Sequence, residues 1–208
     1  MRPDLEVVAE LVAPGSRVLD LGCGDGELLA YLEQHRDCTG TGVDTDPDSM
    51  ISAIRQGVSV IDLDIDTQLD EFADHSYDIV VLSQTLQATR HPAQILAQIE
   101  RIAGLGVVSV PNFAHWRNRL SLAVTGRMPV SQALPYRWQD TPNIHLSSLR
   151  DLEHLFADLQ LQVLNRVTLD PEGHQVKGAL RGGPANLLAA GAAYLVATSS
   201  PVGNAGQG

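Results

Sequence analysis

The feature that most constrains the fold of this chain is the glycine-rich segment Val18–Gly26, which reads VLDLGCGDG. A short apolar run, Arg17–Leu21, comes before its three alternate glycines, and Glu27–Gln34 after them has a helical pattern. Glycines let a backbone turn tightly and approach a ligand, and the amides at a helix N-terminus point toward that ligand. This order predicts a nucleotide-binding βαβ unit, with a tight turn that is merely rich in glycine as the alternative.

Apolar runs and helical patterns alternate through most of the remaining sequence. Pro47 and Pro92 can open helices, and Ser148 can cap a helix that runs to Leu159. Strands that alternate with helices form parallel sheets covered on both faces, with right-handed crossovers. We therefore predict an α/β fold with a doubly wound, mostly parallel, seven-stranded sheet of the Rossmann-like type. Its later strands are expected at Thr39–Asp44, Val58–Leu63, Tyr77–Ser83, Gly106–Val110, Leu161–Leu169 and Ala192–Thr198.

The length of 208 residues suits a single domain, which we expect to span residues 1–198. An insertion at about 112–146 interrupts the pattern, because a connection of this length between a strand and a helix exceeds an ordinary loop. The insertion is rich in aromatic residues and proline, and a helix from His115 to about Val124 fits inside it. Residues 199–208 are expected to form a disordered tail.

Charge and cysteine use exclude several classes of protein. With 14 basic against 25 acidic residues the formal net charge is −11, which disfavours binding to nucleic acid or to anionic lipid. The N-terminus lacks the apolar core of a secretory signal, and no apolar run is long enough to cross a membrane. Cys23 and Cys38 form no disulfide framework or zinc motif, and the seven histidines lack metal-ligand spacing. We expect a cytoplasmic, bacterial-type protein without a metal site.

Acids around the glycine loop indicate the type of nucleotide. A dinucleotide fingerprint needs a third glycine at the position of Glu27, and the carboxylates of Asp20 and Asp25 would repel a diphosphate. The same carboxylates suit a ligand that carries an ammonium and a sulfonium group, and S-adenosylmethionine is such a ligand. Cys23 is interpreted as a small residue between glycines, because the nearby acids raise rather than lower a thiol pKa. The residues thus favour S-adenosylmethionine over NAD.

Two further acids follow predicted strands, where nucleosides bind. Asp44 ends the second strand, 22 residues after Gly22, where its carboxylate can accept both ribose hydroxyls with Thr45 beside it. Asp64 follows the third strand and can accept the exocyclic amine of adenine, while Ile65 supplies an amide and an apolar contact. The adenine assignment can shift by two residues, and an exposed charged turn is the alternative, because other acids crowd this stretch. These acids are Asp62, Asp66 and Asp70.

The candidates for chemistry lie after the fourth strand and in the insertion. S-adenosylmethionine gives up its methyl group by in-line displacement, in which alignment supplies much of the acceleration and no conspicuous nucleophile is needed. Ser83 and Gln84 follow the fourth strand at the ligand edge of the sheet. His145 is the preferred base, ahead of His115 and Asp140, and Gln84 is a second catalytic candidate. A surface or structural histidine is the alternative.

In order along the chain, VLDLGCGDG, GVDTDP, VIDLDID and YDIVVLSQTLQ resemble a class I S-adenosylmethionine-dependent methyltransferase domain. Five further blocks, MRPDLE, SQTLQATRHP, VPNFAHWRNRL, GRMPV and ALPYRWQDTPNIH, closely resemble the methionine biosynthesis protein MetW family. That resemblance covers residues 1 to about 170 and returns at 186–196. It implies a role in bacterial methionine synthesis, in a complex that supports or activates homoserine O-acyltransferase. The wider methyltransferase resemblance implies a set of cofactor residues: Gly22, Gly24 and Gly26 in the loop, Asp44 at ribose, Asp64 and Ile65 at adenine, and Ser83 near the methionine moiety.

Other interpretations stay open from the same residues. An authentic methyltransferase acting on an unknown small molecule would use the same fold, whereas Asp20 and Glu27 disfavour an NAD-dependent enzyme. Methyltransferases of this class usually carry a longer helical region before the first strand, so we expect an open site unless the insertion or another protein covers it. Arginines and aromatic residues alternate in the insertion, as in a protein interface or in a buried lid with a solvated rim. A homo-oligomer or a hetero-oligomer would fit this pattern.

Overall fold

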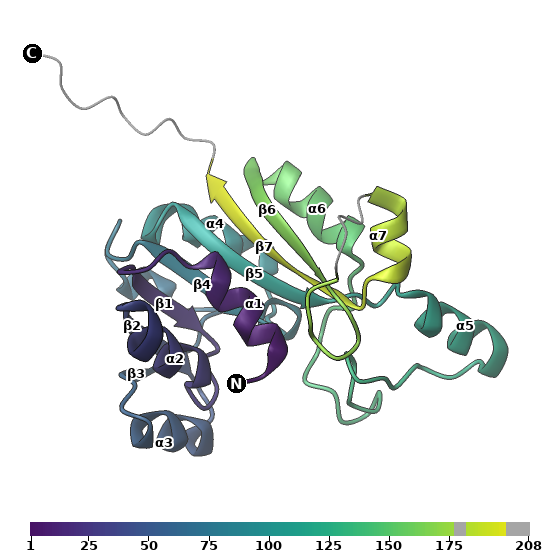
Figure 1. The fold of residues 1–208 in the computed structure, drawn as a ribbon, viewed down its shortest axis with the longest axis horizontal. Helices are drawn as coiled ribbons and strands as arrows, with labels where there is room; N and C mark the ends of the chain where they lie inside the picture. The colour runs from purple at the N-terminus through teal and green to yellow at the C-terminus, as the bar shows by residue number, and fades with distance from the viewer. Residues whose placement is uncertain (177–181, 199–208) are drawn as a thin grey trace, which may run out of the picture.

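A seven-stranded sheet organises the chain (Figure 1). The computed structural model describes residues 1–176 and 182–198, and the expected tail at 199–208 lies outside that part. The strands lie in the order β3-β2-β1-β4-β5-β7-β6, and β7 runs antiparallel to β5 and β6 on either side of it. The predicted α/β fold with a mostly parallel, seven-stranded sheet is therefore confirmed. The bounds are β1 (Arg17–Leu21), β2 (Thr39–Asp44), β3 (Val60–Asp62), β4 (Ile79–Ser83), β5 (Leu105–Pro111), β6 (Leu161–Leu169) and β7 (Gly191–Thr198).

Helices cover both faces of the sheet, and those expected from Pro47, Pro92 and Ser148 are present. Ser148 caps the last of these as predicted, because its Oγ accepts a hydrogen bond from the amide of Asp151 at 3.2 Å and the Asp151 carboxylate accepts one from the amide of Ser148 at 2.9 Å. The bounds are α1 (Pro3–Leu11), α2 (Glu27–Arg36), α3 (Pro47–Arg55), α4 (Pro92–Ile102), α5 (Trp116–Thr125), α6 (Leu149–Asp158) and α7 (Gly182–Leu188), with short 3₁₀ turns η1 (Leu69–Glu71) and η2 (Leu86–Ala88).

Two helices were not anticipated from the sequence. Helix α1 has only nine residues, and it is stabilised by packing, since Leu5 and Val8 are buried against α2 and the sheet. Helix α7 begins with two glycines and a proline, which are the poorest helix formers. Its Ala185 is fully buried, so tertiary contacts override local propensity there.

The two faces of the sheet bury separate apolar clusters. Successive side chains of a strand point to opposite faces, so Val18 joins one cluster and Leu19 the other. One cluster packs under α4 and α6 and includes Phe156 and Tyr194, whose rings meet edge to face. The other packs under α1, α2 and α3. Packing on both faces holds the sheet in place, and the ends of its strands position the candidate site.

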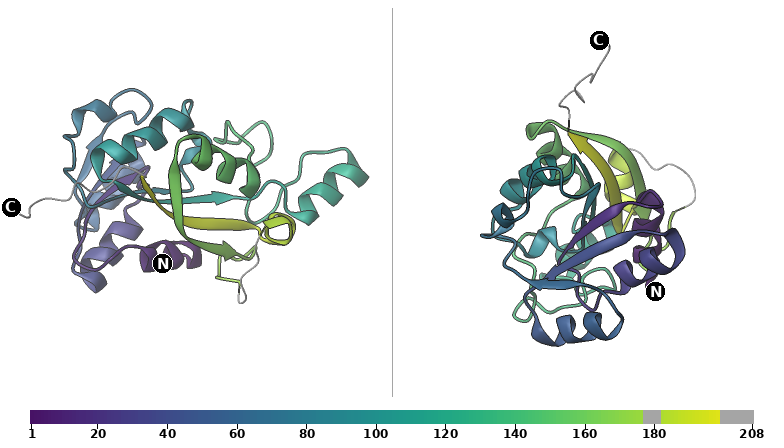
Figure 2. Two further views of the ribbon diagram at one scale, coloured as in Figure 1. Left: turned by 90° about the horizontal axis from the view of Figure 1, so that it is seen from above. Right: turned by 90° about the vertical axis from the view of Figure 1, so that its left-hand side faces the viewer.

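The segment 113–146, called the arm below, leaves the sheet after β5 and returns before α6. It contains α5, which matches the helix predicted from His115 to about Val124. Figures 1 and 2 both show α5 standing away from the sheet. Just before the arm, the buried side chain of Asn112 donates hydrogen bonds to the backbone oxygens of Asn186 and Ala189, each at 2.8 Å. The root of the arm is therefore tied to α7.

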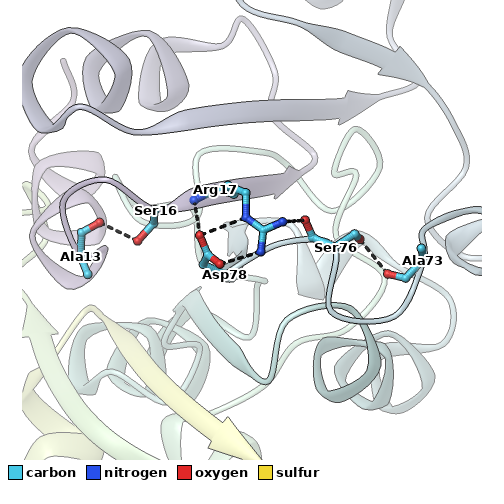
Figure 3. A network of polar contacts seen from close by, with 6 residues as sticks. All are labelled: Ala13, Ser16, Arg17, Ala73, Ser76 and Asp78. Carbon is cyan, nitrogen blue, oxygen red and sulfur yellow. Dashed lines mark hydrogen bonds and ion pairs between the residues drawn. The ribbon is translucent and has the colours of Figure 1, made fainter.

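At the amino ends of two central strands, an ion pair joins the starts of β1 and β4 (Figure 3). The Arg17 guanidinium donates to both carboxylate oxygens of Asp78, at 2.8 and 3.3 Å, and to the backbone oxygen of Ser76 at 2.8 Å. These hydrogen bonds hold the pKa of Asp78 below its ordinary value. The pair lies at the amino ends of the strands, away from the glycine loop.

Across the described ranges no helix has the length and apolarity needed to traverse a bilayer.

Candidate functional site

The glycine loop is held against the end of β2 by its own backbone. The amides of Gly22 and Cys23 donate to the carbonyl oxygen of Val43 at 2.8 and 3.0 Å, and the amide of Gly24 donates to the Asp44 carboxylate at 2.7 Å. Gly22 has a φ of +77°, and a Cβ on it would lie 2.5 Å from the Thr85 hydroxyl. Only glycine fits this close approach between the loop and the segment after β4.

A cavity of about 220 Å³, called the loop cavity below, opens beside this turn. It brings together five of the residues predicted from the sequence, which are Asp20, Gly22, Cys23, Gly24 and Ser83. A Cβ on Gly24 would meet nothing within 4 Å, so the loop leaves free space on this side. Gly26 does not line the cavity. It precedes α2 with a φ of +79° and lets α2 approach Ala53 of α3.

Asp20 gives the loop cavity its electrostatic character. Its side chain is 2% exposed, and its Oδ1 atom is buried without a hydrogen-bond partner in the described part of the chain. Burial, with a smaller contribution from the charge of Asp44, raises the pKa of Asp20 to about 7. An unpartnered buried carboxylate is costly, and a cation placed beside it removes that cost. The residue therefore fits the ammonium group of a ligand.

Asp44 lies at the sheet edge expected of a ribose acid, and its carboxylate already makes several hydrogen bonds. Oδ2 accepts from the amide of Gly24, while Oδ1 accepts from the amides of Thr45 at 2.8 Å and Asp46 at 3.0 Å. Asp44 is half-buried and Thr45 is exposed. Each carboxylate oxygen can accept more than one hydrogen bond, so Asp44 can organise the loop and still accept ribose hydroxyls.

The structure separates the roles of the acids near Asp64. Asp66 is committed to the approach to α4, because its carboxylate accepts from the amides of Arg90 and His91 at 2.9 to 3.0 Å. Asp64 is half-buried, and its Oδ1 accepts from the amide of Asp66 at 2.9 Å. No hydrogen bond from within the described residues reaches its other oxygen. Ile65 is half-buried against the apolar cluster under α4 and α6. Among the crowded acids, Asp64 keeps an acceptor available at this edge.

A second and larger hollow, called the wide cavity below, adjoins the loop cavity and has a volume of about 550 Å³. The two share Arg2, Gly22 and Ser83. Ser83 and Gln84 are fixed there by Ser109, whose Oγ lies 3.2 Å from the Ser83 hydroxyl and accepts from the amide of Gln84 at 3.1 Å. The remaining walls come from the segment after β4, from the arm and from the loop after β6.

Three side chains of these walls had no predicted role. Arg2 lines both cavities because α1 packs beside α2, an arrangement that no local pattern signals. Tyr136 lies within the block ALPYRWQDTPNIH, which carried the resemblance but no assigned role. Gln87 is 6% exposed and its Oε1 is buried without a partner in the described chain.

The structure does not bring His145 to these cavities. Its side chain is exposed and lines a separate hollow with Leu86 and Leu155, and its amide donates to the backbone oxygen of Gln87 at 2.9 Å. His115 is buried at the start of α5, and burial together with the charge of Arg117 lowers its pKa. No histidine is among the described residues that line the wide cavity.

Cys23 is inert in this setting. Burial, and then the charges of Asp20 and Asp44, raises the pKa of its thiol to about 12, which confirms the predicted direction. Both Cys23 and Cys38 are buried and free. Within residues 1–176 and 182–198, no cluster of three or more His, Cys, Asp or Glu side chains has the arrangement to hold a metal ion.

Comparisons with known proteins identify a family and a fold. The family model described as methionine biosynthesis protein MetW matches residues 2–196. A relative from Rhodopirellula baltica, the bifunctional methionine biosynthesis protein MetXA/MetW, is 30% identical over 181 residues. The match covers 83% of this chain and 29% of that relative, so the chain spans less than a third of the relative's length.

Solved structures of low sequence identity share the fold. A S-adenosylmethionine-dependent methyltransferase from Thermotoga maritima, described as a possible histamine N-methyltransferase, has a TM-score of 0.68 at 17% identity and matches over 94% of this chain and 87% of its own. A S-adenosylmethionine-dependent methyltransferase from Mesorhizobium loti has a TM-score of 0.67 at 14% identity, over 92% and 96% of the two chains. The sheet described above is thus that of the class I methyltransferases.

Proposed function

Because this chain belongs to the methionine biosynthesis protein MetW family, we propose that it binds S-adenosylmethionine beside the glycine loop and acts together with homoserine O-acyltransferase. The observation that carries the nucleotide part is Asp20, a buried residue that lines a cavity at the carboxyl edge of a methyltransferase-type sheet and has a carboxylate oxygen without a hydrogen-bond partner in the described chain. A ligand with an ammonium group and no phosphate suits this acid. The cytoplasmic location expected from the sequence is part of the same proposal.

Each part of the ligand would contact different residues of the chain. Asp20 would accept from the ammonium group, and Arg2, which also lines the loop cavity, would pair with the carboxylate of the same amino-acid moiety. The free space at Gly24 admits the ligand close to the backbone. Asp44 would accept the ribose hydroxyls, and Asp64 the adenine amine. When bound, the cofactor supplies an activated methyl group.

The partner part rests on the bifunctional relative. In that protein one chain carries the MetW-type region together with a much longer remainder, and its name joins MetXA to MetW. Two regions that are fused in one chain in one organism are good candidates for a complex between separate chains in another organism. Fusion keeps the two regions at a high effective concentration, which a complex also achieves. We propose that this chain raises the activity of a homoserine O-acyltransferase and that the nucleotide modulates this support.

A second candidate function is methyl transfer to a small molecule. The observation that favours it is the wide cavity, which adjoins the loop cavity at Ser83 and offers room for an acceptor. Gln84 lines it, and alignment by such polar walls is what an in-line displacement requires. No histidine base is available from its described lining, so an acceptor that is already nucleophilic fits best.

Two experiments test these functions separately. Calorimetric titration with S-adenosylmethionine and S-adenosylhomocysteine is expected to show binding that Asp20→Asn weakens; absence of heat at millimolar ligand would rule out the nucleotide part. Assays of acyl transfer to homoserine with and without this chain test the partner part, which fails if neither the rate nor a binding signal changes. Incubation with methyl-labelled cofactor and a metabolite extract tests the second function, for which a labelled product is required.

A further inference from the structure

The arm presents an apolar surface that nothing in the described chain covers. Of the exposed large apolar side chains in residues 1–176 and 182–198, about half lie on the arm. Helix α5 buries only Asn118, and Val124 and Trp138 are each 75% exposed. Exposed apolar side chains that gather on one segment, rather than being scattered singly over the surface, are typical of an interaction site. The exposed apolar residues are Trp116, Leu120, Leu122, Val124, Met128, Val130, Tyr136, Trp138, Ile144 and Leu146.

Hydrogen bonds hold the base of the arm in a defined position. The amide of Phe113 donates to the backbone oxygen of Ser147 at 3.1 Å, which joins the two ends of the arm. The buried side chain of Asn118 donates to the backbone oxygen of Phe113 at 3.2 Å and so fixes the first turn of α5. The backbone oxygen of Gln87 accepts from the amides of Ile144 and His145 at 2.9 Å each. These bonds hold the apolar surface in place before any partner arrives.

The charge of the arm is opposite to that of the rest of the chain. Residues 113–146 contain four arginines and one aspartate, which gives the arm a net charge of +3. Since the whole chain has a net charge of −11, the remainder carries −14. The guanidinium of Arg117 lies 5.5 Å from the centre of the Trp116 ring, a cation–π pair at the start of α5. Arginine and tryptophan are the residues most enriched at the energetic centres of protein interfaces.

The arm also contains an apolar hollow of about 230 Å³. Its walls include Met128, Tyr136 and Trp138, and its floor includes the buried Leu134. A hollow of this kind, within an apolar surface and beside arginines, can take one anchoring apolar side chain of a protein partner.

We propose that the arm is the surface by which this chain binds the homoserine O-acyltransferase, at an apolar patch of that enzyme bordered by carboxylates. The inference rests on the proposed function for the identity of the partner and adds the place and chemistry of contact. The excess of positive charge on the arm matches an acidic border, and the apolar hollow matches a protruding apolar side chain. An anionic membrane is the less favoured occupant, because the remainder of the chain carries −14 and would be repelled by it.

The test compares arm variants with matched controls in binding to the purified acyltransferase. Leu120→Asp places a charge on α5 where the side chain is 54% exposed, and Ile54→Asp makes the same kind of change on α3 where it is 59% exposed. Trp138→Ser empties one wall of the hollow. Arg127→Glu reverses an arm charge, with Arg55→Glu as its control. We expect each arm variant to weaken the dissociation constant at least tenfold, the controls to match the wild type, and S-adenosylmethionine binding to persist in all.

The outcomes separate the two proposals. If the wild-type chain does not bind the acyltransferase, the proposed function loses its partner. If the wild type binds and the arm variants bind equally well, the proposed function stands and the arm inference is overturned. Light scattering of the wild type and of Leu120→Asp tests whether a second copy of this chain occupies the arm. Flotation with vesicles containing anionic lipid tests whether a membrane does. A dimer or a vesicle complex that only the arm variants lose would overturn the acyltransferase as occupant.

Discussion

The carboxylate of Asp44 accepts a hydrogen bond from the amide of Gly24 at 2.7 Å, across 20 residues of sequence. The bond ties the end of β2 to the middle of the glycine loop, so the shape of the loop and the position of the candidate ribose acid are set together. A ligand that engages Asp44 therefore meets a loop that the same side chain has already arranged. This is preorganisation in the sense that lowers the entropic cost of binding.

The first prediction concerns Asp44 itself. Asp44→Ala removes the acceptor for both ribose and loop, and we expect S-adenosylmethionine affinity to fall by about 2–4 kcal/mol, tens to hundreds of fold. Asp44→Asn keeps one oxygen acceptor and is expected to lose less. Calorimetry measures both, and circular dichroism checks that the variants remain folded. Asp48→Ala, four residues further on in α3, is the control, and equal affinities for it and for Asp44→Ala would contradict the assignment.

The second prediction is a pH dependence that originates at Asp20. Its pKa is raised to about 7 in the folded chain, against about 3.9 for an unperturbed aspartate in the unfolded chain. Between these values the folded state holds a proton that the unfolded state has lost, so stability falls as the pH rises through this window. The slope for one proton is at most about 1.4 kcal/mol per pH unit.

Urea unfolding between pH 4 and pH 8 measures the effect, and Asp20→Asn is expected to flatten it. Asp25→Asn, which alters an exposed carboxylate in the same loop, serves as the matched control. A wild-type profile that Asp20→Asn leaves unchanged would show that this carboxyl does not titrate as described.

The third prediction separates neighbouring acids at β3. Asp64 retains an acceptor at the sheet edge, whereas Asp62 is exposed on β3 and Asp66 holds the start of α4. Asp64→Ala should weaken adenosine-containing ligands by about 1.5–3 kcal/mol, the range for a charged hydrogen bond, while Asp62→Ala leaves affinity unchanged. Asp66→Ala should instead lower the unfolding free energy. Loss of affinity on Asp62→Ala alone would move the adenine contact two residues earlier.

The fourth prediction distinguishes two glycines of one loop. Gly22→Ala places a Cβ 2.5 Å from the Thr85 hydroxyl at a positive φ, so we expect a marked loss of stability. Gly24→Ala meets no atom within 4 Å and should cost only the strain of its φ of +56°, about 1–2 kcal/mol. It fills the space kept for the ligand and should still weaken binding.

The double variant Gly22→Ala with Thr85→Ala completes the comparison. Removing the Thr85 side-chain atoms relieves the closest contacts, so part of the lost stability should return. Thermal unfolding measures the stability of the wild type and of the three variants, Gly22→Ala, Gly24→Ala and the double variant. No recovery in the double variant would mean that backbone strain alone, rather than the close approach, requires glycine at this position.

The fifth prediction links the nucleotide to the arm. The arm contributes walls to the wide cavity, and Gln87, whose backbone oxygen accepts hydrogen bonds from the arm, lines the same cavity. A ligand that orders these walls should tighten binding of the acyltransferase about fivefold or more, and by thermodynamic reciprocity the partner must tighten the nucleotide by the same factor. Paired titrations measure both factors. Identical dissociation constants with and without nucleotide would contradict the coupling.

The strands and the glycine loop could be predicted because local pattern determines them. Runs such as Leu161–Leu169 carry their own signal, and the loop glycines follow from close approach. Helix α7 could not be predicted, since Ala185 is held by packing that outweighs two glycines and a proline. Nor could Arg2, which reaches both cavities only through the docking of α1.

The candidate site divides in the same way. Asp20 and Ser83 come from strand ends and line the same cavity, because parallel strands end at one edge. His145 was placed by its motif alone, and the path of the arm carries it to another hollow. The path of a long irregular connection depends on contacts between residues that are distant in sequence, such as the hydrogen bond between Ile144 and Gln87. A local sequence pattern does not predict such contacts.

The antiparallel strand β7 is synthesised after both β5 and β6, yet it lies between them in the finished sheet. On the ribosome, β5 therefore waits with one bare edge and β6 has no strand to join until residues 191–198 emerge. Completion of the fold is thus delayed until translation of this stretch is over, and a nascent chain stalled before it would expose a strand edge open to aggregation.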